Sequence, residues 1–293
     1  MTRLPPALSP RVVADPAELR RLIDEQRASR QSVGFVPTMG ALHEGHLSLV
    51  DACRRECGCT VVSIFVNPAQ FSPGEDFDRY PRPLQADLEL LAGHSVDIVF
   101  TPSKELMYPA RHATWIEMGG PALPLEGQFR PGHFRGVATV VLKLFNLVRP
   151  DRAYFGRKDY QQSLVVRRMV EDLDLPVYVV VCPTVRDADG LALSSRNMYL
   201  SADERRRALA IPASLRLARQ SFEQGVTDTA AILARMQDTL EAAQLKIEYV
   251  AIVDRDTLEP IETLNGPALA AVAARVGTTR LIDNELLGSD SSR

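Results

Sequence analysis

The stretch that decides the fold is Val33-Gly34-Phe35-Val36-Pro37-Thr38-Met39-Gly40-Ala41-Leu42-His43-Glu44-Gly45-His46-Leu47. It begins as an apolar run without polar alternation, which is typical of a strand covered on both faces. From Leu47 onward, apolar residues recur at the spacing of one helical face, so the pattern predicts a strand, a glycine-bearing turn and a helix that begins at or near Gly45. Glycines let the backbone approach a ligand closely, and a helix N-terminus attracts anions. The turn therefore suits a phosphate group.

Two histidines enter this turn three residues apart, so His43 and His46 can point at the same bound group once the first helical turn has formed. Three interpretations remain open: the pair contacts an anion, it caps the turn structurally, or it supplies two ligands of a zinc site. Zinc needs three or four ligands, and neither a third histidine nor a cysteine lies close in the sequence.

Strands alternate with helices over the first part of the chain, which predicts a doubly wound, Rossmann-like α/β fold with a parallel sheet of about five strands. After the strand that begins at Val33, we expect strands at residues 60–66, 96–100, 151–156 and 177–181. The predicted helices cover residues 16–29 with Asp15 as N-cap, 84–91, 137–148 and 160–173. Ligands of such sheets bind beyond the carboxyl ends of the strands, so His43, His46, Asn67 and Gln70 should share one edge.

A second, smaller α+β domain is predicted after a boundary between residues 184 and 185, which gives domains at 1–184 and 185–293. Residues 202–243 are rich in helical patterns, and residues 247–254, 268–276 and 279–287 look like antiparallel strands. Residues 119–136 are rich in glycine and proline and are expected to form a long loop. We expect residues 1–14 to be a loose arm and residues 288–293 a disordered, flexible tail.

Composition excludes several classes of function. The 293-residue chain is 45% hydrophobic, and its net charge of -3 without a long basic run argues against nucleic acid as a partner. No apolar stretch approaches the ~20 residues of a membrane span, and the first residues lack a secretory signal, so we expect a cytoplasmic protein with a small-molecule substrate. The four cysteines show no repeated CxxC pattern and are expected to be free thiols. Neither GxxxxGK[ST] nor GxGxxG is present.

The run from Pro37 to His46 resembles the HxGH signature of the nucleotidylyltransferase superfamily, in the form carried by the pantoate–β-alanine ligase family. Matches to this family recur downstream in the right order and cover nearly the whole chain. The resemblance implies condensation of pantoate with β-alanine at the expense of ATP, through a pantoyl adenylate, with Mg²⁺ as the metal and a homodimer formed through the first domain. It implies ATP contacts from Met39, Gly40, Ala41, Leu42, His43, Glu44, Gly45 and His46.

Two further segments match the family's nucleotide motifs. Gly156-Arg157-Lys158-Asp159 follows a strand and opens a helix; by itself it would be a solvated helix start, but it is similar to the family's GEKD segment, with Arg157 in place of Glu. Leu193-Ser194-Ser195-Arg196-Asn197 would by itself be a turn, and it is similar to the family's SSR motif, which implies contacts with the β- and γ-phosphates. Val185 matches a position that contacts adenosine.

The remaining matches concern the second substrate and the metal. The segment Asn67-Pro68-Ala69-Gln70-Phe71 resembles the family's NPxQF, whose glutamine contacts pantoate, and Gln162 matches a second pantoate glutamine. An amide both donates and accepts hydrogen bonds, which suits a hydroxy acid. Asp87 and Asp159 are candidate carboxylates near Mg²⁺. His133 matches a histidine in a mobile loop of the family.

The resemblance also implies a mechanism in which His43, His46, Lys158 and Arg196 act in catalysis, with His46 as the candidate proton donor. We expect hinge motion near Val185 to bring the histidine turn and the Ser-Ser-Arg segment onto one triphosphate and to exclude water from the adenylate. Two alternatives stay open. A superfamily relative would transfer the adenylyl group to a phosphate ester and keep it in the product, and a regulatory module would bind ATP without turnover.

Overall fold

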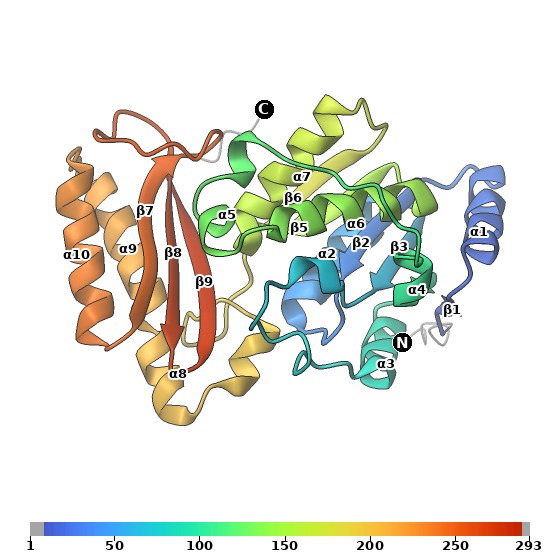
Figure 1. Ribbon diagram of the computed structural model, residues 1–293, viewed down its shortest axis with the longest axis horizontal. Coiled ribbons are helices and arrows are strands. Elements are labelled where there is room, and N and C mark those ends of the chain that lie inside the picture. Colours follow the sequence, from blue (N-terminus) through green and yellow to red (C-terminus); the bar gives the residue numbers. More distant parts are fainter. Residues whose placement is uncertain (1–8, 289–293) are drawn as a thin grey trace, which may run out of the picture. The chain divides into compact units, whose positions relative to one another are not determined.

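The computed structural model describes residues 9–288, and the chain divides into two compact units (Figure 1). The first comprises the chain up to Met118, Arg130–Arg157 and Gln162–Pro183, and the second comprises Gly119–Phe129, Lys158–Gln161 and the chain from Thr184 onward. The last segment of the second unit begins at Thr184, one residue before the expected boundary. However, two short segments from before that boundary also belong to the second unit, so the chain passes between the units at more places than the single junction near Val185.

The first unit contains a parallel sheet in the order β1-β4-β3-β2-β5-β6, which confirms the doubly wound fold. Its strands are β1 (Arg11–Val13), β2 (Val33–Thr38), β3 (Cys59–Ile64), β4 (Ile98–Phe100), β5 (Arg152–Gly156) and β6 (Tyr178–Cys182). The prediction of a loose arm over residues 1–14 is wrong for β1, which pairs with β4 at the edge of the sheet and buries Val13. Three residues are too short for a periodic signal. Residues 1–8 of that arm lie outside the described part.

Helices cover both faces of this sheet. Val36 belongs to the apolar cluster with α2, whereas the ring of its neighbour Phe35 meets Phe145 of α6 at a centroid distance of 6.4 Å. Successive residues of a strand point to opposite faces, so α2 and α6 lie on opposite sides, which explains the uninterrupted apolar run at Val33. The helices that include residues of this unit are α1 (Pro16–Ala28), α2 (Glu44–Glu56), α3 (Leu84–Gly93), α4 (Lys104–Met107), α6 (His133–Val148) and α7 (Tyr160–Asp172).

One helix prediction is confirmed, and one loop prediction is wrong. Asp15 is the N-cap of α1, as expected, and accepts hydrogen bonds from the amides of Ala17 and Glu18 at 2.7 and 2.9 Å. Residues 119–136, in contrast, are not one irregular loop: they contain the 3₁₀ turn Gly120–Ala122, the short helix α5 (Glu126–Phe129) and the first turn of α6. Gly132, with a φ of 82°, is the N-cap of α6, so a residue that suggests a loop instead starts a helix.

The second unit contains a three-stranded antiparallel sheet in the order β7-β8-β9, which confirms the smaller α+β part (Figure 1). Its elements are β7 (Lys246–Asp254), β8 (Ala268–Val276), β9 (Thr279–Leu287), α8 (Ala202–Ala208), α9 (Ala210–Glu223) and α10 (Thr229–Ala242). Apolar side chains of α9 and α10, such as Leu215 and Met236, pack with Val272 and Leu281 of the sheet. Gly288 is the last described residue, so residues 289–293 of the predicted tail lie outside. Within residues 9–288, no helix has the length and apolar character needed to cross a membrane.

Candidate active site

The polar segments singled out in the sequence follow three neighbouring strands. β2 lies between β3 and β5, because the chain builds β3 and β4 on one side of β2 and returns to build β5 and β6 on the other. The carboxyl ends of parallel strands meet at one edge, and ligands bind at the point where the strand order reverses. The histidine turn follows β2, the turn of Asn67 follows β3 and Gly156 ends β5, which places all three at that edge.

The histidine turn is held by a buried carboxylate. Gly40 and Ala41 have φ angles of 79° and 51°, which turn the chain sharply after β2. Asp87 of α3 accepts hydrogen bonds from the amides of Ala41 and Leu42 at 2.9 and 2.8 Å, one on each oxygen, and only 2% of the residue is exposed. Burial raises the pKa of Asp87, and the hydrogen bonds from Leu42 and Ala41 lower it by less. These contacts show that Asp87 holds the turn, and its placement near Mg²⁺ stays a prediction.

His43 and His46 begin α2 and face each other, with ring centroids 4.2 Å apart. Nδ1 of His43 accepts from the amide of Gly45 at 3.2 Å, and Nδ1 of His46 accepts from the amide of His43 at 3.4 Å. A nitrogen that accepts a hydrogen bond carries no proton, so in the neutral rings the proton is on Nε2. The structural interpretation and the anion interpretation are thus compatible: Nδ1 caps the helix and Nε2 is a donor.

A metal interpretation of the histidine pair has no support from its surroundings. Among residues 9–288, no group of three or more His, Cys, Asp or Glu side chains could hold a metal ion. The helix N-terminus instead adds positive potential to the two imidazoles. The turn can therefore stabilise negative charge.

The amide pair Asn67 and Gln70 is buried beside this turn, with 1% and 9% of the two residues exposed. Nδ2 of Asn67 donates to Oε1 of Gln70 at 2.9 Å and to the carbonyl of Gly136 at 3.1 Å. Because Oε1 of Gln70 is already an acceptor, its amide orientation is set by Asn67. At Gly136 a Cβ atom would lie 2.0 Å from the carbonyl oxygen of Ala69, so α6 approaches this segment at a distance that only glycine permits.

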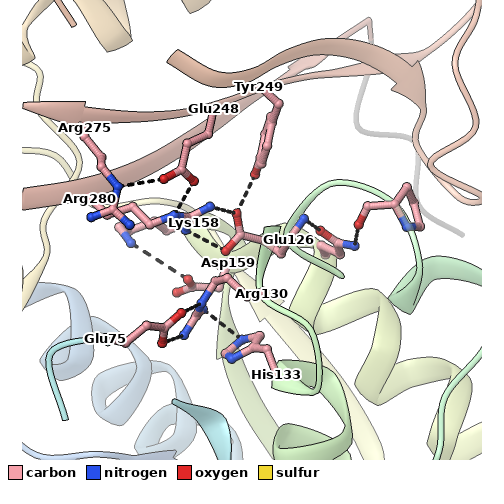
Figure 2. A network of polar contacts seen from close by, with 12 residues as sticks. Glu75, Glu126, Arg130, His133, Lys158, Asp159, Glu248, Tyr249, Arg275 and Arg280 are labelled. Atoms are coloured by element: carbon pink, nitrogen blue, oxygen red, sulfur yellow. Dashed lines mark hydrogen bonds and ion pairs between the residues drawn. The ribbon is translucent and has the colours of Figure 1, made fainter. Parts of the chain in front are cut away.

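His133 is the first residue of α6 and is buried, so the prediction that it lies in a loop is wrong. Nη1 of Arg130 lies 3.2 Å from Nε2 of His133 (Figure 2). Nδ1 of His133 lies 2.8 Å from the carbonyl oxygen of Gln70. Arginine only donates, so Nε2 accepts and Nδ1 carries the proton. This pair of contacts directs His133 toward the backbone of Gln70.

Arg130 also donates two hydrogen bonds to the carboxylate of Glu75, from Nε to Oε1 at 2.7 Å and from Nη2 to Oε2 at 2.8 Å. Burial raises the pKa of Glu75, but the hydrogen bond and the charge of Arg130, together with smaller effects of the Ser72 backbone and His133, lower it by more, so the pKa lies below its ordinary value. Nη2 of Arg130 further donates to the carbonyl of Gln70 at 3.2 Å. Sequence reasoning missed Glu75 and Arg130, whose contacts span more than fifty residues.

In the second unit, the Ser-Ser-Arg segment follows a tight hairpin. The amide of Leu193 donates to the carbonyl of Val185 at 3.0 Å, which places two residues predicted to contact ATP opposite each other. Oγ of Ser194 accepts from the amide of Arg196 at 3.2 Å and caps the 3₁₀ helix Ser195–Tyr199. The segment is therefore held by hydrogen bonds within the hairpin and its own first turn.

Lys158 and Asp159 lie in a 3₁₀ turn directly after β5, in the segment that belongs to the second unit. Nζ of Lys158 is 3.9 Å from Oδ1 of Asp159, and the carbonyl of Lys158 accepts from Nδ2 of Asn284 at 2.8 Å. Gln162 is half-buried in α7 and belongs to the first unit. Lys158 and Gln162 are thus four residues apart in the sequence but belong to different units.

Comparisons of the chain with known protein families, curated proteins and solved structures identify one family. The family model for pantoate-β-alanine ligase matches residues 11–286. The pantothenate synthetase of Moorella thermoacetica is 53% identical over 92% of this chain and 96% of its own, and that of Acidobacterium capsulatum is 56% identical over 88% and 87%. The chain belongs to the pantoate–β-alanine ligase family. It is therefore an ATP-dependent ligase of pantothenate biosynthesis.

Solved structures of the pantoate–β-alanine ligase family share the fold of this chain. The pantothenate synthetase of Thermus thermophilus is 51% identical and superposes with a TM-score of 0.89 over 94% of this chain and 98% of its own. The pantoate-β-alanine ligase of Francisella tularensis, solved in complex with β,γ ATP and β-alanine, is 36% identical with a TM-score of 0.79 over 94% and 97%. The family's fold thus extends over nearly the whole chain.

Proposed function

We propose that this chain condenses (R)-pantoate with β-alanine in two steps. In the first, a carboxylate oxygen of pantoate attacks the α-phosphorus of ATP, and pyrophosphate leaves with the electrons of the broken P–O bond. In the second, the amine of β-alanine attacks the acyl carbon of the pantoyl adenylate and AMP leaves. The observation that carries this proposal is the imidazole pair at the N-terminus of α2, with both Nδ1 atoms accepting backbone hydrogen bonds.

The chemistry of the first step explains why these side chains suit the role. Negative charge spreads over a five-coordinate phosphorus and a departing pyrophosphate, so donors already in place contribute most of the catalysis. His43 and His46 would donate from Nε2 to the α/β-phosphate region, with His46 as the proton donor. The residues proposed to contact the rest of ATP are Met39, Gly40, Ala41, Leu42, Glu44, Gly45, Gly156, Arg157, Lys158, Asp159, Val185, Leu193, Ser194, Ser195 and Arg196.

Pantoate would be held by amides. We assign it to Gln70, Gln162 and Asn67, since an amide can donate to the carboxylate and accept from a hydroxyl of the same molecule. Asn67 occupies Oε1 of Gln70 and thereby directs the Nε2 donors of Gln70 away from itself. This arrangement supports Gln70 as a donor to pantoate, with Asn67 setting its orientation.

The proposal includes Mg²⁺ bound with ATP. Mg²⁺ on a nucleotide keeps several waters and takes one or two protein carboxylates in addition to the phosphates. Asp159 fits this requirement, because its side chain is 47% exposed and lies beside Lys158. When bound, the ion would neutralise charge on the phosphates. We further propose a cytoplasmic homodimer formed through the first unit, which size-exclusion chromatography with light scattering would test.

The decisive experiment is ATP–pyrophosphate exchange. The proposed first step predicts exchange that needs pantoate and Mg²⁺ but no amine, followed by AMP release when β-alanine is added. An adenylyltransferase that acts on a phosphate ester would retain the adenylyl group in its product, and a regulatory module would give no exchange with any acid. Either result would reject the proposed function.

Two substitutions test the assigned residues. Removing one donor from a site that stabilises developing charge costs about 2.7–4 kcal/mol, so His46→Ala and Lys158→Ala should each slow exchange by about 10²–10³ while the protein still folds. His94→Ala is the matched control, because the His94 ring bonds to Asp51 at 2.8 Å, away from the turn. Unchanged exchange in His46→Ala or Lys158→Ala would refute the role of that residue.

A further inference from the structure

The two phosphate-binding motifs of the second unit are both attached to one strand. Asp283 and Asn284 are neighbours on β9 and are buried, with 4% and 6% of the residues exposed. Neighbouring residues of a strand point to opposite faces of the sheet. Asp283 therefore shares a face with Leu281, which packs into the helical core, and Asn284 shares the opposite face with Arg280.

On that opposite face, β9 holds the segment that carries Lys158. Nδ2 of Asn284 donates to the carbonyl of Lys158 at 2.8 Å. The other end of the segment is Gln161, whose Oε1 accepts from the amide of Glu126 at 3.1 Å. Arg280 in turn donates two hydrogen bonds to Glu126, at 2.8 Å from Nη1 and 2.6 Å from Nη2 (Figure 2). One end of the four-residue segment is thus bonded directly to Asn284 of β9, and the other end is connected to Arg280 of β9 through Glu126.

The carboxylate of Glu126 has a second partner on β7, at the other edge of the three-stranded sheet. The hydroxyl of Tyr249 on β7 donates to Oε1 of Glu126 at 2.9 Å, and Glu248 receives a hydrogen bond from Nε of Arg280 at 2.7 Å (Figure 2). A buried carboxylate with this many charged and neutral donors has little freedom to move. The segment of Lys158 is therefore attached to a rigid group of side chains.

On the helical face, β9 holds the hairpin that carries the Ser-Ser-Arg segment. Arg186 donates to both oxygens of Asp283, from Nη1 at 2.6 Å and from Nη2 at 3.1 Å. Arg186 pairs with Ala192 across the hairpin, and the carbonyl of Ala192 accepts from Nδ2 of Asn197 at 3.0 Å. The planar fork of an arginine on a carboxylate fixes orientation as well as distance. Asp283 thereby fixes the position of the first hairpin residue, Arg186, relative to β9.

We propose that Asn284 and Asp283 are positioning residues for adenylation: Asn284 acts through Lys158, and Asp283 acts through Arg186 on the Ser-Ser-Arg segment. This inference rests on the proposed function, in which Lys158 and Arg196 contact ATP. Because both anchors are on consecutive residues of one strand, the spacing between the two motifs is set by the strand itself. Neither Asp283 nor Asn284 touches the nucleotide in this proposal.

The test is steady-state ATP–pyrophosphate exchange on the full chain with Asn284→Ala, Asn284→Ser and Asp283→Asn. We expect kcat to fall at least tenfold in each variant, with the KM for pantoate unchanged. The effect of Asn284→Ala should shrink to less than twofold in the Lys158→Ala background, and that of Asp283→Asn should do so in the Arg196→Ala background. If Asn284 or Asp283 only stabilised the fold, its substitution would lower kcat by the same factor in the unsubstituted chain and in the chain that already lacks Lys158 or Arg196.

Thr229→Val is the matched control for lost stability. Thr229 is buried in the same unit, and the single proton on its Oγ1 is shared between two distant backbone carbonyls, those of Ile261 at 2.8 Å and Glu262 at 2.7 Å. Its thermal midpoint should fall about as far as that of Asn284→Ala, while its exchange rate stays within twofold of the unsubstituted chain. Full exchange in Asn284→Ala together with loss in Lys158→Ala would overturn the positioning role alone. Full exchange in Lys158→Ala would instead refute the proposed function of that lysine.

Discussion

Replacing Asp87 by asparagine tests what holds the histidine turn in place. The two carboxylate oxygens of Asp87 accept the amides of Ala41 and Leu42 at 2.9 and 2.8 Å. Asparagine keeps one acceptor and puts an NH₂ group where the other oxygen was. One of the two backbone amides would then face a donor in a site that is almost completely buried.

The expected loss follows from two opposing contributions. A hydrogen bond to a charged group contributes about 1.5–3 kcal/mol, and the amide that loses it is left buried without an acceptor. In the other direction, asparagine avoids the burial of a charge, a cost that is visible in the raised pKa of Asp87. We expect a net loss of about 1–2 kcal/mol, which at a slope of about 2 kcal/mol/M lowers the urea midpoint by about 0.5–1 M.

Tryptophan fluorescence can follow this unfolding, because Trp115 is the only tryptophan of the chain and belongs to the first unit, where it stacks on Tyr108 at a centroid distance of 5.7 Å. Asp97→Asn is the control: a single oxygen of Asp97 accepts the amide of Thr60 at 2.7 Å, and asparagine can keep that bond. Asp87→Asn should also slow ATP–pyrophosphate exchange, since its turn carries the histidines. A urea midpoint equal to that of Asp97→Asn, with full exchange, would refute the reasoning.

Two further predictions concern the buried amides and their neighbours. Gly136→Ala would put a Cβ atom 2.0 Å from the carbonyl oxygen of Ala69, so it should destabilise the chain by about 1–3 kcal/mol in urea unfolding and raise the KM for pantoate by displacing Gln70. The pKa of Glu75 lies below its ordinary 4.5, so the stability that its pairing with Arg130 provides is present above pH 4.5 and lost as the pH falls through the folded-state pKa. Measured from pH 7 to 3, the stability difference between the unsubstituted chain and Glu75→Gln should therefore shrink below pH 4.5; a constant difference would contradict it.

Much of the fold follows from periodicity, because apolar spacing is a local property of the chain. The predicted strands at residues 268–276 and 279–287 coincide with β8 and β9, and the helix predicted at Gly45 begins one residue earlier. Periodicity failed where an element is short or begins with an unusual residue. β1 has three residues, and α6 begins after Gly132 in a left-handed conformation.

Only some residues of the candidate site could be predicted from the sequence. Residues that occur in short motifs, such as His43 and His46, could be found because their spacing has a chemical meaning on a helix. Residues that act by holding a motif have no such signal. Asp87 lies 46 residues from the amide that it accepts, and Asn284 lies 126 residues from Lys158. No pattern within a window of the sequence connects such pairs.

The same argument explains why a domain boundary placed at one point in the chain could not be complete. Buried backbone and side-chain polar groups need hydrogen-bond partners. A segment therefore packs with the unit that supplies those partners. Lys158–Gln161 precedes the boundary by more than twenty residues, yet its bonds go to Asn284 and Glu126, so it belongs to the second unit. Since β9 also holds Arg186, a change in this strand should affect both motifs that we propose to contact ATP.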